Sequence, residues 1–548
     1  MEKFIYNKVV LVVKGFFLFA LLSLFASCSD YFDTEVLNKQ STESSYSTVQ
    51  DIDQALVGVY GRLRPISLFY WQMSECRSDN VYVTSARVRP ASVVAHFESS
   101  SLLENSIVLD CWDRYYELVA AANKLLDEID GVDFSGYNTK MLAVGWNATQ
   151  LKEHYIAEAR FMRALAYFDL VRYFGRVPAT THAISVEEGF NLKQSEPLDV
   201  YHNIIIPDML YAVEHLNYAA YDYQAKAHAE RLTKPAAQAM LARIYLTLSG
   251  FPYHESHEAD AKDLLKTVID YSAANGNKWW APTMNDWNRQ WIHENENKYP
   301  IFEIQYSMTK GMGNPMTPYC STNMQPYTDW CKKGFLCADV SMVVPDKLIK
   351  HFTTDPETDD ESNTYTDLRG TYTFSGVALN ENGEYEEGTE GKNFNWKFIE
   401  SIKKRANLGY SSIDGQMVDR TCWPQNFPLL RLEDVMLMYA ELVGPTTDGY
   451  DAINRIRQRA GLPNLEGLTA DDFQQAVRRE RQYELAGEGQ RWHDLVRWNV
   501  YVETMRQQFI DQDQAVYADF VKKESYLYPI PWTQMKVREG LYQQNPGY

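Results

Sequence analysis

The sequence lacks runs of basic residues. Its 548 residues include 53 Lys and Arg against 73 Asp and Glu, which gives a formal net charge of −20 at pH 7. Nucleic-acid binding draws on clustered Lys and Arg that neutralise phosphates. This chain is therefore a poor candidate for a nucleic-acid partner. The acidity favours solubility and says little about the fold.

The sequence also lacks the short motifs of several enzyme classes. It contains no glycine-rich nucleotide loop, no Cys-x-x-Cys pair and no local Ser-His-Asp motif. A catalytic triad assembled from distant positions leaves no spacing signal, so that alternative stays open. The sequence predicts no bound cofactor.

The N-terminal apolar run is too short to cross a bilayer comfortably. It spans residues 15–26 and follows Lys3, Lys8 and Lys14, as in an export signal. Ala26-Ser27-Cys28 then resembles a bacterial lipobox, in which the cysteine is acylated and begins the mature chain. We predict a lipoprotein signal peptide at residues 1–27 and lipidation of Cys28. The alternative is an ordinary signal peptide beside a free cysteine.

Loss of residues 1–27 removes three lysines and one glutamate, so the net charge falls by two to −22. Several acyl chains on Cys28 would hold a soluble domain firmly on a membrane, because one chain alone binds only marginally.

Cysteines are few for a chain of this length. The six besides Cys28 are Cys76, Cys111, Cys320, Cys331, Cys337 and Cys422. The spacing of Cys320, Cys331 and Cys337 matches no zinc pattern. A disulfide within this cluster and free thiols are both open alternatives, because a large exported core needs no disulfide.

Helical periodicity dominates both ends of the chain. Ile52, Leu56, Val59 and Leu63 form one apolar stripe. Comparable patterns occupy residues 105–130, 151–175, 200–217, 233–250, 257–276, 429–443, 449–461 and 469–498. Alanines in residues 236–242 permit close helix packing, so we expect paired helices similar to tetratricopeptide repeats, without a strict 34-residue period.

Residues 275–423 differ from both ends. Gly, Asn, Pro, Tyr and Trp become dense there, and short strand-like runs such as IFEIQYS appear. Loop-rich regions of this length are functional or disordered. The aromatic content favours a functional region.

Several segments, in order along the chain, resemble the SusD/RagB family. They include CSDYFDTEV at residues 28–36, EARFMRALAYFDLVRYFGRVP at 158–178, RLEDVMLMYAE at 431–441, AINRIRQRAGL at 452–462, ERQYELAGEGQRWHDLVRW at 480–498, YPIP at 528–531 and the terminal QNPGY. A single block would be weak evidence, but the ordered set spans the mature chain.

The resemblance implies a mainly α fold: a SusD-like scaffold of tetratricopeptide-like helix pairs with a loop-rich, ligand-binding remainder that contains short strands. We therefore divide the chain into an N-terminal helical region at 28–274, a loop-rich aromatic region at 275–423 and a C-terminal helical region at 424–548. Residues 28–548 are expected to form one compact unit.

The resemblance also implies a function without catalysis. Such proteins are lipid-anchored on the outer membrane, face the cell exterior, bind a glycan and pass it to a SusC-like TonB-dependent transporter. One alternative is a RagB-type lipoprotein that binds peptides. A less favoured alternative is a surface glycoside hydrolase, which requires a carboxylate pair about 5 to 10 Å apart in a cleft.

The densest charged cluster has a structural and a catalytic interpretation. Its members are Glu480, Arg481, Glu484, Glu488, Arg491 and Asp494. Spacings of three and four residues favour charge pairing on a helix over acid–base chemistry. We predict a structural network.

Two further polar segments raise the question of metal binding. HESHE at 254–258 lacks the i, i+4 histidine pair of a zinc helix. DPETDDESNTYTD at 355–367 lacks the central glycine and terminal glutamate of a calcium loop. We predict no metal site, with adventitious calcium at the second segment left open.

Aromatic residues on loops are the predicted glycan contacts. An exposed Trp or Tyr ring stacks on the apolar face of a sugar, and planar polar groups bind its hydroxyls. The candidates come from residues 70–83 and 279–330: Trp71, Arg77, Asp79, Asn80, Trp287, Trp291, Tyr327 and Trp330. Core packing is the alternative for each, because large aromatics are mostly buried.

Overall fold

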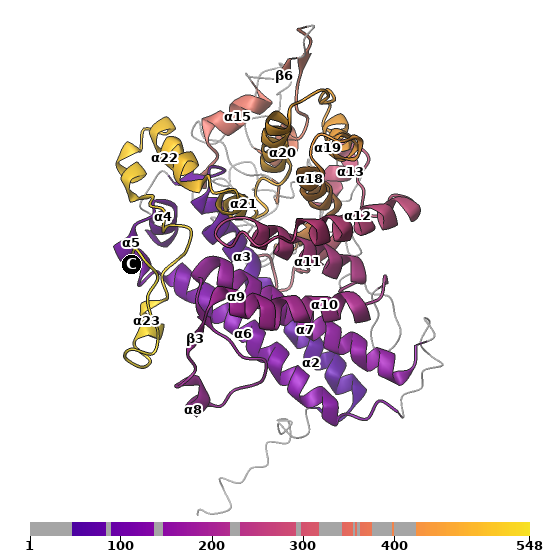
Figure 1. Ribbon diagram of the computed structural model, residues 1–548, viewed down its shortest axis with the longest axis vertical. Coiled ribbons are helices and arrows are strands. Elements are labelled where there is room, and N and C mark those ends of the chain that lie inside the picture. The colour runs from indigo at the N-terminus through magenta and orange to yellow at the C-terminus, as the bar shows by residue number, and fades with distance from the viewer. Residues whose placement is uncertain are drawn as a thin grey trace, which may run out of the picture. The chain divides into compact units, whose positions relative to one another are not determined.

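The computed structural model describes residues 46–83, 89–135, 146–219, 231–291, 298–316, 342–353, 357–358, 362–374, 397–398 and 423–548. Residues Thr48–Tyr548 form one compact unit. The unit is mainly helical, which confirms the predicted fold class (Figure 1).

Three long helices form the N-terminal part of this unit. They are α2 (Val49–Gly61), α6 (Ser106–Glu128) and α7 (Ala148–Phe174). Helix α2 packs on both α6 and α7, and α6 lies along α7 (Figure 1). The apolar stripe of α2 is buried at Ile52, Leu56 and Val59.

Helix α7 shows how local sequence sets the limits of an element. Asn147 caps its start by accepting a hydrogen bond from the Gln150 N–H, while the Gln150 side chain accepts from the Asn147 N–H. Gly175 ends it with φ +66, a backbone conformation that favours glycine. Gly175 is therefore the C-terminal cap of α7.

The stack continues through α10 (Ile206–His215), α11 (Lys234–Ser249) and α12 (Glu258–Ala274), each packed on the preceding helix. The alanines of α11, including Ala236, Ala239 and Ala242, are fully buried, as close helix packing requires. Helix α12 then contacts α18 (Leu432–Val443), which packs on α19 (Thr447–Arg459) and α20 (Ala470–Glu484).

The described strands are short and antiparallel. Strand β4 (Pro300–Ile304) pairs with β8 (Phe427–Arg431), and Phe302 lies opposite Leu430. The other pairs are β1 (Tyr82–Val83) with β5 (Met342–Val343), β2 (Val177–Pro178) with β3 (Gln194–Ser195), and β6 (Glu357–Thr358) with β7 (Thr364–Tyr365). Strand β8 leads directly into α18, so the pairing of β4 with β8 joins the loop-rich region to the C-terminal helices.

Short helices complete the unit. They are α3 (Ser67–Phe69), η3 (Tyr70–Ser74), η4 (Glu75–Arg77), α4 (Arg89–Ala95), α5 (Ser99–Leu102), α8 (Val186–Gly189), α9 (Pro197–Val200), η8 (Tyr201–Ile205), α13 (Met284–Arg289), α15 (Asp346–Phe352), α16 (Gly370–Thr373), α21 (Arg491–Arg497), α22 (Tyr501–Asp511), η11 (Ala515–Phe520) and α23 (Trp532–Met535), with single turns at 64–66 and 129–131. Among the described helices, none is both long and apolar enough for a membrane span.

Candidate functional site

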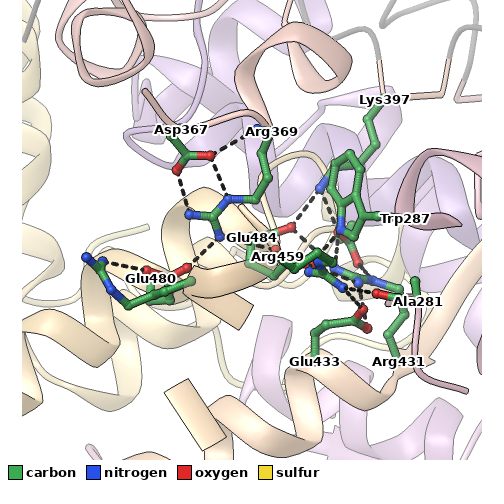
Figure 2. A network of polar contacts seen from close by, with 12 residues as sticks. Ala281, Trp287, Asp367, Arg369, Lys397, Arg431, Glu433, Arg459, Glu480 and Glu484 are labelled. Atoms are coloured by element: carbon green, nitrogen blue, oxygen red, sulfur yellow. Dashed lines mark hydrogen bonds and ion pairs between the residues drawn. The ribbon is translucent and has the colours of Figure 1, made fainter. Parts of the chain in front are cut away.

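A buried ion network joins the loop-rich region to the C-terminal helices, and Figure 2 shows its core. Its five acidic and five basic side chains are each at most 5% exposed: Asp367, Glu433, Glu480, Glu484 and Glu488 with Arg369, Lys397, Arg431, Arg457 and Arg459. We call this set the interior ion network.

Glu484, near the end of α20, lies at the centre of the network. Its Oε1 accepts from Arg459 at 2.9 Å and from Arg431 at 3.1 Å, while Oε2 accepts from Arg369 at 3.2 Å. The indole Nε1 of Trp287 also donates to Oε1, at 2.7 Å. Burial alone would disfavour the charged carboxylate, yet the surrounding guanidinium groups hold the pKa of Glu484 far below its usual range.

Two loop segments are attached through this network. Arg369 donates to Asp367 and to Glu480, the latter at 2.6 Å. Lys397 donates to Glu488 at 2.7 Å, and its ammonium lies 4.9 Å from the ring centroid of Trp291. The carboxylates of the interior ion network therefore face buried cations.

A second set of buried pairs lies beside the first. Arg481 donates to Asp434 at 2.8 Å and to Asp494 at 2.8 Å. Asp434 also accepts from Arg243 of α11, at 2.6 Å. After burial, which opposes ionisation, Arg243 and Arg481 lower the pKa of Asp434 to about 2.

The predicted structural interpretation of the charged cluster is thus confirmed, but its predicted geometry needs correction. Most partners come from distant segments, such as Arg369, Lys397 and Arg431, and not from neighbours on one helix. The charge-rich blocks were visible in the sequence and indicated that a network would form. The partners that lie more than 50 residues away could not be identified from a single sequence.

Three tryptophans predicted as sugar platforms lie in the core instead. Trp71, Trp287 and Trp291 are each at most 1% exposed. The Trp287 and Trp291 rings pack edge to face at 5.5 Å, and Trp291 packs likewise on Phe398. A ring that stacks on a glycan must present a face to solvent. The prediction that these three rings bind ligand is therefore wrong for this structure.

Arg77 and Asn80 are also interior residues. The Arg77 guanidinium donates to the carbonyl oxygens of Val94 and Ser525, and it lies 4.1 Å from the ring centroid of Phe97. Asn80 donates to Glu75 at 2.9 Å and accepts from Gln482. These contacts tie the segment after η3 to the C-terminal region, which corrects their predicted role in ligand binding.

Asp79 lies nearer the surface, with 15% of its side chain exposed. Arg491 binds both of its carboxylate oxygens, at 2.7 and 2.8 Å, and Gln482 donates to Oδ2. This bidentate pair and the Gln482 bond take up most of the hydrogen-bond acceptor capacity of the carboxylate. Asp79 therefore serves first as a structural partner of Arg491.

Other predicted positions fall outside the described residues. These are Cys28, Tyr327, Trp330, Cys320, Cys331, Cys337 and Cys422. Of the described cysteines, Cys76 and Cys111 are both buried.

The two candidate metal segments take different structural roles. Glu255 pairs with His202 at 3.1 Å and with His257 at 3.3 Å, and His257 precedes α12 as its N-cap. Asp367, the last residue of the acidic segment, belongs to the interior ion network. Within the part of the chain that the structure describes, no three His, Cys, Asp or Glu residues are arranged to hold a metal ion.

An open cleft of about 780 Å³ lies at the surface, between the turn that follows α11, helix α22 and residues 523–526. None of its lining residues is among the predicted ligand contacts. Its aromatic members are spread over positions 251, 501 and 526, so no local motif marks them.

Two protein-family models match this chain, one in each half. The SusD family model matches residues 298–548, and a second model, described as "Starch-binding associating with outer membrane", matches residues 30–246. SusD-like protein P25 of Formosa agariphila is 25% identical over 532 residues, covering 89% of this chain and 90% of its own length.

Solved structures share the fold. A SusD homologue from Bacteroides thetaiotaomicron matches with a TM-score of 0.72 at 22% identity, covering 95% of this chain and all of its own. A laminarin-binding SusD-like protein matches with a TM-score of 0.67 at 21% identity, covering 92% of this chain and all of its own. With both family models matched in order and a shared fold, this chain belongs to the SusD/RagB family.

Proposed function

We propose that this protein is a cell-surface lipoprotein that captures a glycan and passes it to a SusC-like TonB-dependent transporter. Two matches support the proposal: the model described as starch-binding and outer-membrane-associated, and the fold shared with a laminarin-binding protein. The lipid anchor rests on the lipobox-like sequence at Cys28.

One observation carries the choice of binding over catalysis. The carboxylate-rich cluster, the strongest sequence candidate for acid–base chemistry, is sealed in the interior and fully ion-paired around Glu484. A glycoside hydrolase needs one carboxyl group that can donate a proton and a second that faces the sugar, both inside a cleft. Glu480, Glu484 and Glu488 meet neither condition.

The proposed capture mechanism is stacking and hydrogen bonding without bond cleavage. The interior ion network holds segments around Trp287, Arg369 and Lys397, which belong to the loop-rich region. Loops based on this rigid support would carry the ligand surface, and Tyr327 and Trp330 stay our proposed aromatic contacts within it.

Affinity electrophoresis tests this assignment. The purified mature chain would be run through gels that contain laminarin, soluble starch, galactomannan or polygalacturonate. We expect retardation by at least one glycan, reduced about fivefold or more in affinity by Trp330→Ala. The matched control is Trp532→Ala, because Trp532 is 41% exposed and lies in another part of the chain. Equal binding by Trp330→Ala and the wild type would remove Trp330 from the site.

The anchor and the partner have separate tests. Cys28→Ser should move the protein from the membrane fraction to the soluble fraction of the producing cell, because the acyl chains would be lost. An unchanged membrane fraction would contradict lipidation at Cys28. Recovery of the transporter with a tagged wild-type protein, and not with an unrelated lipoprotein, tests the partner.

A further inference from the structure

The cleft beside α22 has the floor of a carbohydrate site. Phe251 and Tyr526 are half-buried there, and their rings meet edge to face at 5.2 Å and 80°. Both pack on a buried cluster that includes Trp492, Tyr501 and Phe509. Rings fixed from below and open above are suited to stack on a flat apolar surface.

One face of helix α22 lines the rim of the cleft. Glu503, Arg506, Gln507 and Ile510 have the spacings of three and four residues that place side chains side by side. The Arg506 Nε and Nη2 groups donate to the Val521 carbonyl oxygen at 3.2 and 2.9 Å, which fixes the guanidinium plane. Its Nη1 has no partner among the described residues and is available to a ligand.

Other groups at the rim also keep hydrogen-bonding capacity. Within the described ranges, neither the Glu503 carboxylate nor the Asn499 amide has a side-chain partner. Carboxylate, amide and guanidinium groups bind adjacent hydroxyls in a bidentate manner. The charges of Glu503 and Glu524 balance those of Arg506 and Lys523, so the cleft selects neither an anion nor a cation.

From this arrangement we infer that the cleft is a second binding site, for a neutral glycan chain. Its volume of about 780 Å³ is within the range of about 300 to 1,000 Å³ typical of ligand sites. All its residues lie at position 251 or between 499 and 526, so none of them belongs to the loop-rich region 275–423. It rests on the proposed function only in that its ligand is also a glycan.

Substitutions in the cleft test this site. The full mature chain would be titrated with neutral laminarin, starch and galactomannan and with anionic polygalacturonate. We expect Tyr526→Ala and Arg506→Ala each to weaken binding of a neutral glycan about fivefold or more. Trp532→Ala and Arg538→Ala, which change an aromatic and an arginine outside the cleft, should leave it unchanged. Because Arg506 is exposed, its variant keeps the test valid if Tyr526→Ala folds poorly.

The outcomes separate this inference from the proposed function. Neutral-glycan binding that survives both cleft substitutions but is lost in Trp330→Ala would overturn the cleft site and support the loop site. Loss in the cleft variants alone would support the cleft site. Preference for polygalacturonate, or for a protein partner with no glycan bound, would overturn the cleft as a neutral-glycan site. Failure of the wild type to bind any neutral glycan would overturn the cleft site, and failure to bind any neutral glycan or polygalacturonate would overturn the proposed function as well.

Discussion

Asp367 shows how pairing outweighs burial for a single carboxylate. Burial opposes its ionisation, but the Arg369 guanidinium, with hydrogen bonds from His351 and Arg369, lowers the pKa of Asp367 to about 2. Arg369 donates to Oδ2 at 2.6 Å and to Oδ1 at 2.9 Å. The folded state therefore binds this proton more weakly than the unfolded state does.

A carboxyl group with a depressed pKa stabilises the fold above its unfolded pKa and loses that contribution in acid. For Asp367 the loss should occur between about pH 4 and 2 and amount to about 2 kcal/mol. Urea unfolding of wild type and Asp367→Asn at pH 5, 4, 3 and 2 measures it. The difference in free energy of unfolding between the two proteins should narrow as pH falls. A difference that stays constant with pH would contradict a depressed pKa for Asp367.

Substitution of Glu484 is expected to lower the stability of the protein more than substitution of Asp367. Glu484→Ala would leave Arg369, Arg431 and Arg459 buried with one fewer counter-charge. Removing one partner of a buried ion pair costs about 3 to 5 kcal/mol. Denaturant unfolding should show a loss of this size, while Glu466→Ala at an exposed position should change stability by less than about 0.5 kcal/mol. A loss of stability for Glu484→Ala as small as that for Glu466→Ala would mean that the interior ion network adds little to the stability of the fold.

At the scale of elements, the loop between α20 and α21 packs directly on η3. Gly489 has φ +75, its N–H donates to Glu75 at 2.7 Å, and its carbonyl oxygen accepts from Ser74 at 2.7 Å. An added Cβ would lie 2.4 Å from the Tyr70 Cβ. Only glycine permits this approach between segments more than 400 residues apart.

Gly489→Ala should therefore destabilise the protein by about 3 kcal/mol or more, through overpacking and backbone strain together. Gly276→Ala is the matched control, because Gly276 has φ +73 with nothing within 4 Å of its added Cβ. We expect about 1 kcal/mol for the control. Thermal unfolding monitored by circular dichroism compares them, and equal shifts would contradict the close packing at Tyr70.

Helices were predictable from sequence because their signals are local. The stripe at Ile52 and Leu56, the buried alanines of α11 and Gly175 as a cap each depend on neighbouring residues. The predicted helix at 469–498 is in fact two, α20 and α21, since residues 485–490 form the loop that packs on Tyr70. That interruption depends on a distant contact, which local periodicity does not report.

The predicted site was less accurate for a related reason. Aromatic and polar residues clustered in sequence at 70–83 and 279–330 suggested a ligand-binding surface. The structure instead buries Trp71 in the core, and it uses Trp287 and Arg77 to hold distant segments together. Residue type alone does not separate a ligand platform from a core contact. The cleft at Phe251 and Tyr526 was not predictable from sequence, because these two residues are 275 positions apart in the chain.

At the scale of the whole molecule, Thr48–Tyr548 is one compact unit in which N-terminal and C-terminal segments interlock. Ser74 bonds to Gly489, and Arg77 bonds to Ser525. We expect a single cooperative unfolding transition. Coincident transitions by tryptophan fluorescence and circular dichroism would agree with this, whereas two separated transitions would contradict it.

The central claim is that this protein binds a glycan and leaves it intact. The most direct measurement is equilibrium dialysis of the mature chain against length-defined neutral oligosaccharides, followed by chromatography of the recovered sugar. Our account predicts saturable binding of at least one oligosaccharide and recovery at its original length. Shortened sugar, or saturable binding of peptides with no oligosaccharide bound, would contradict it.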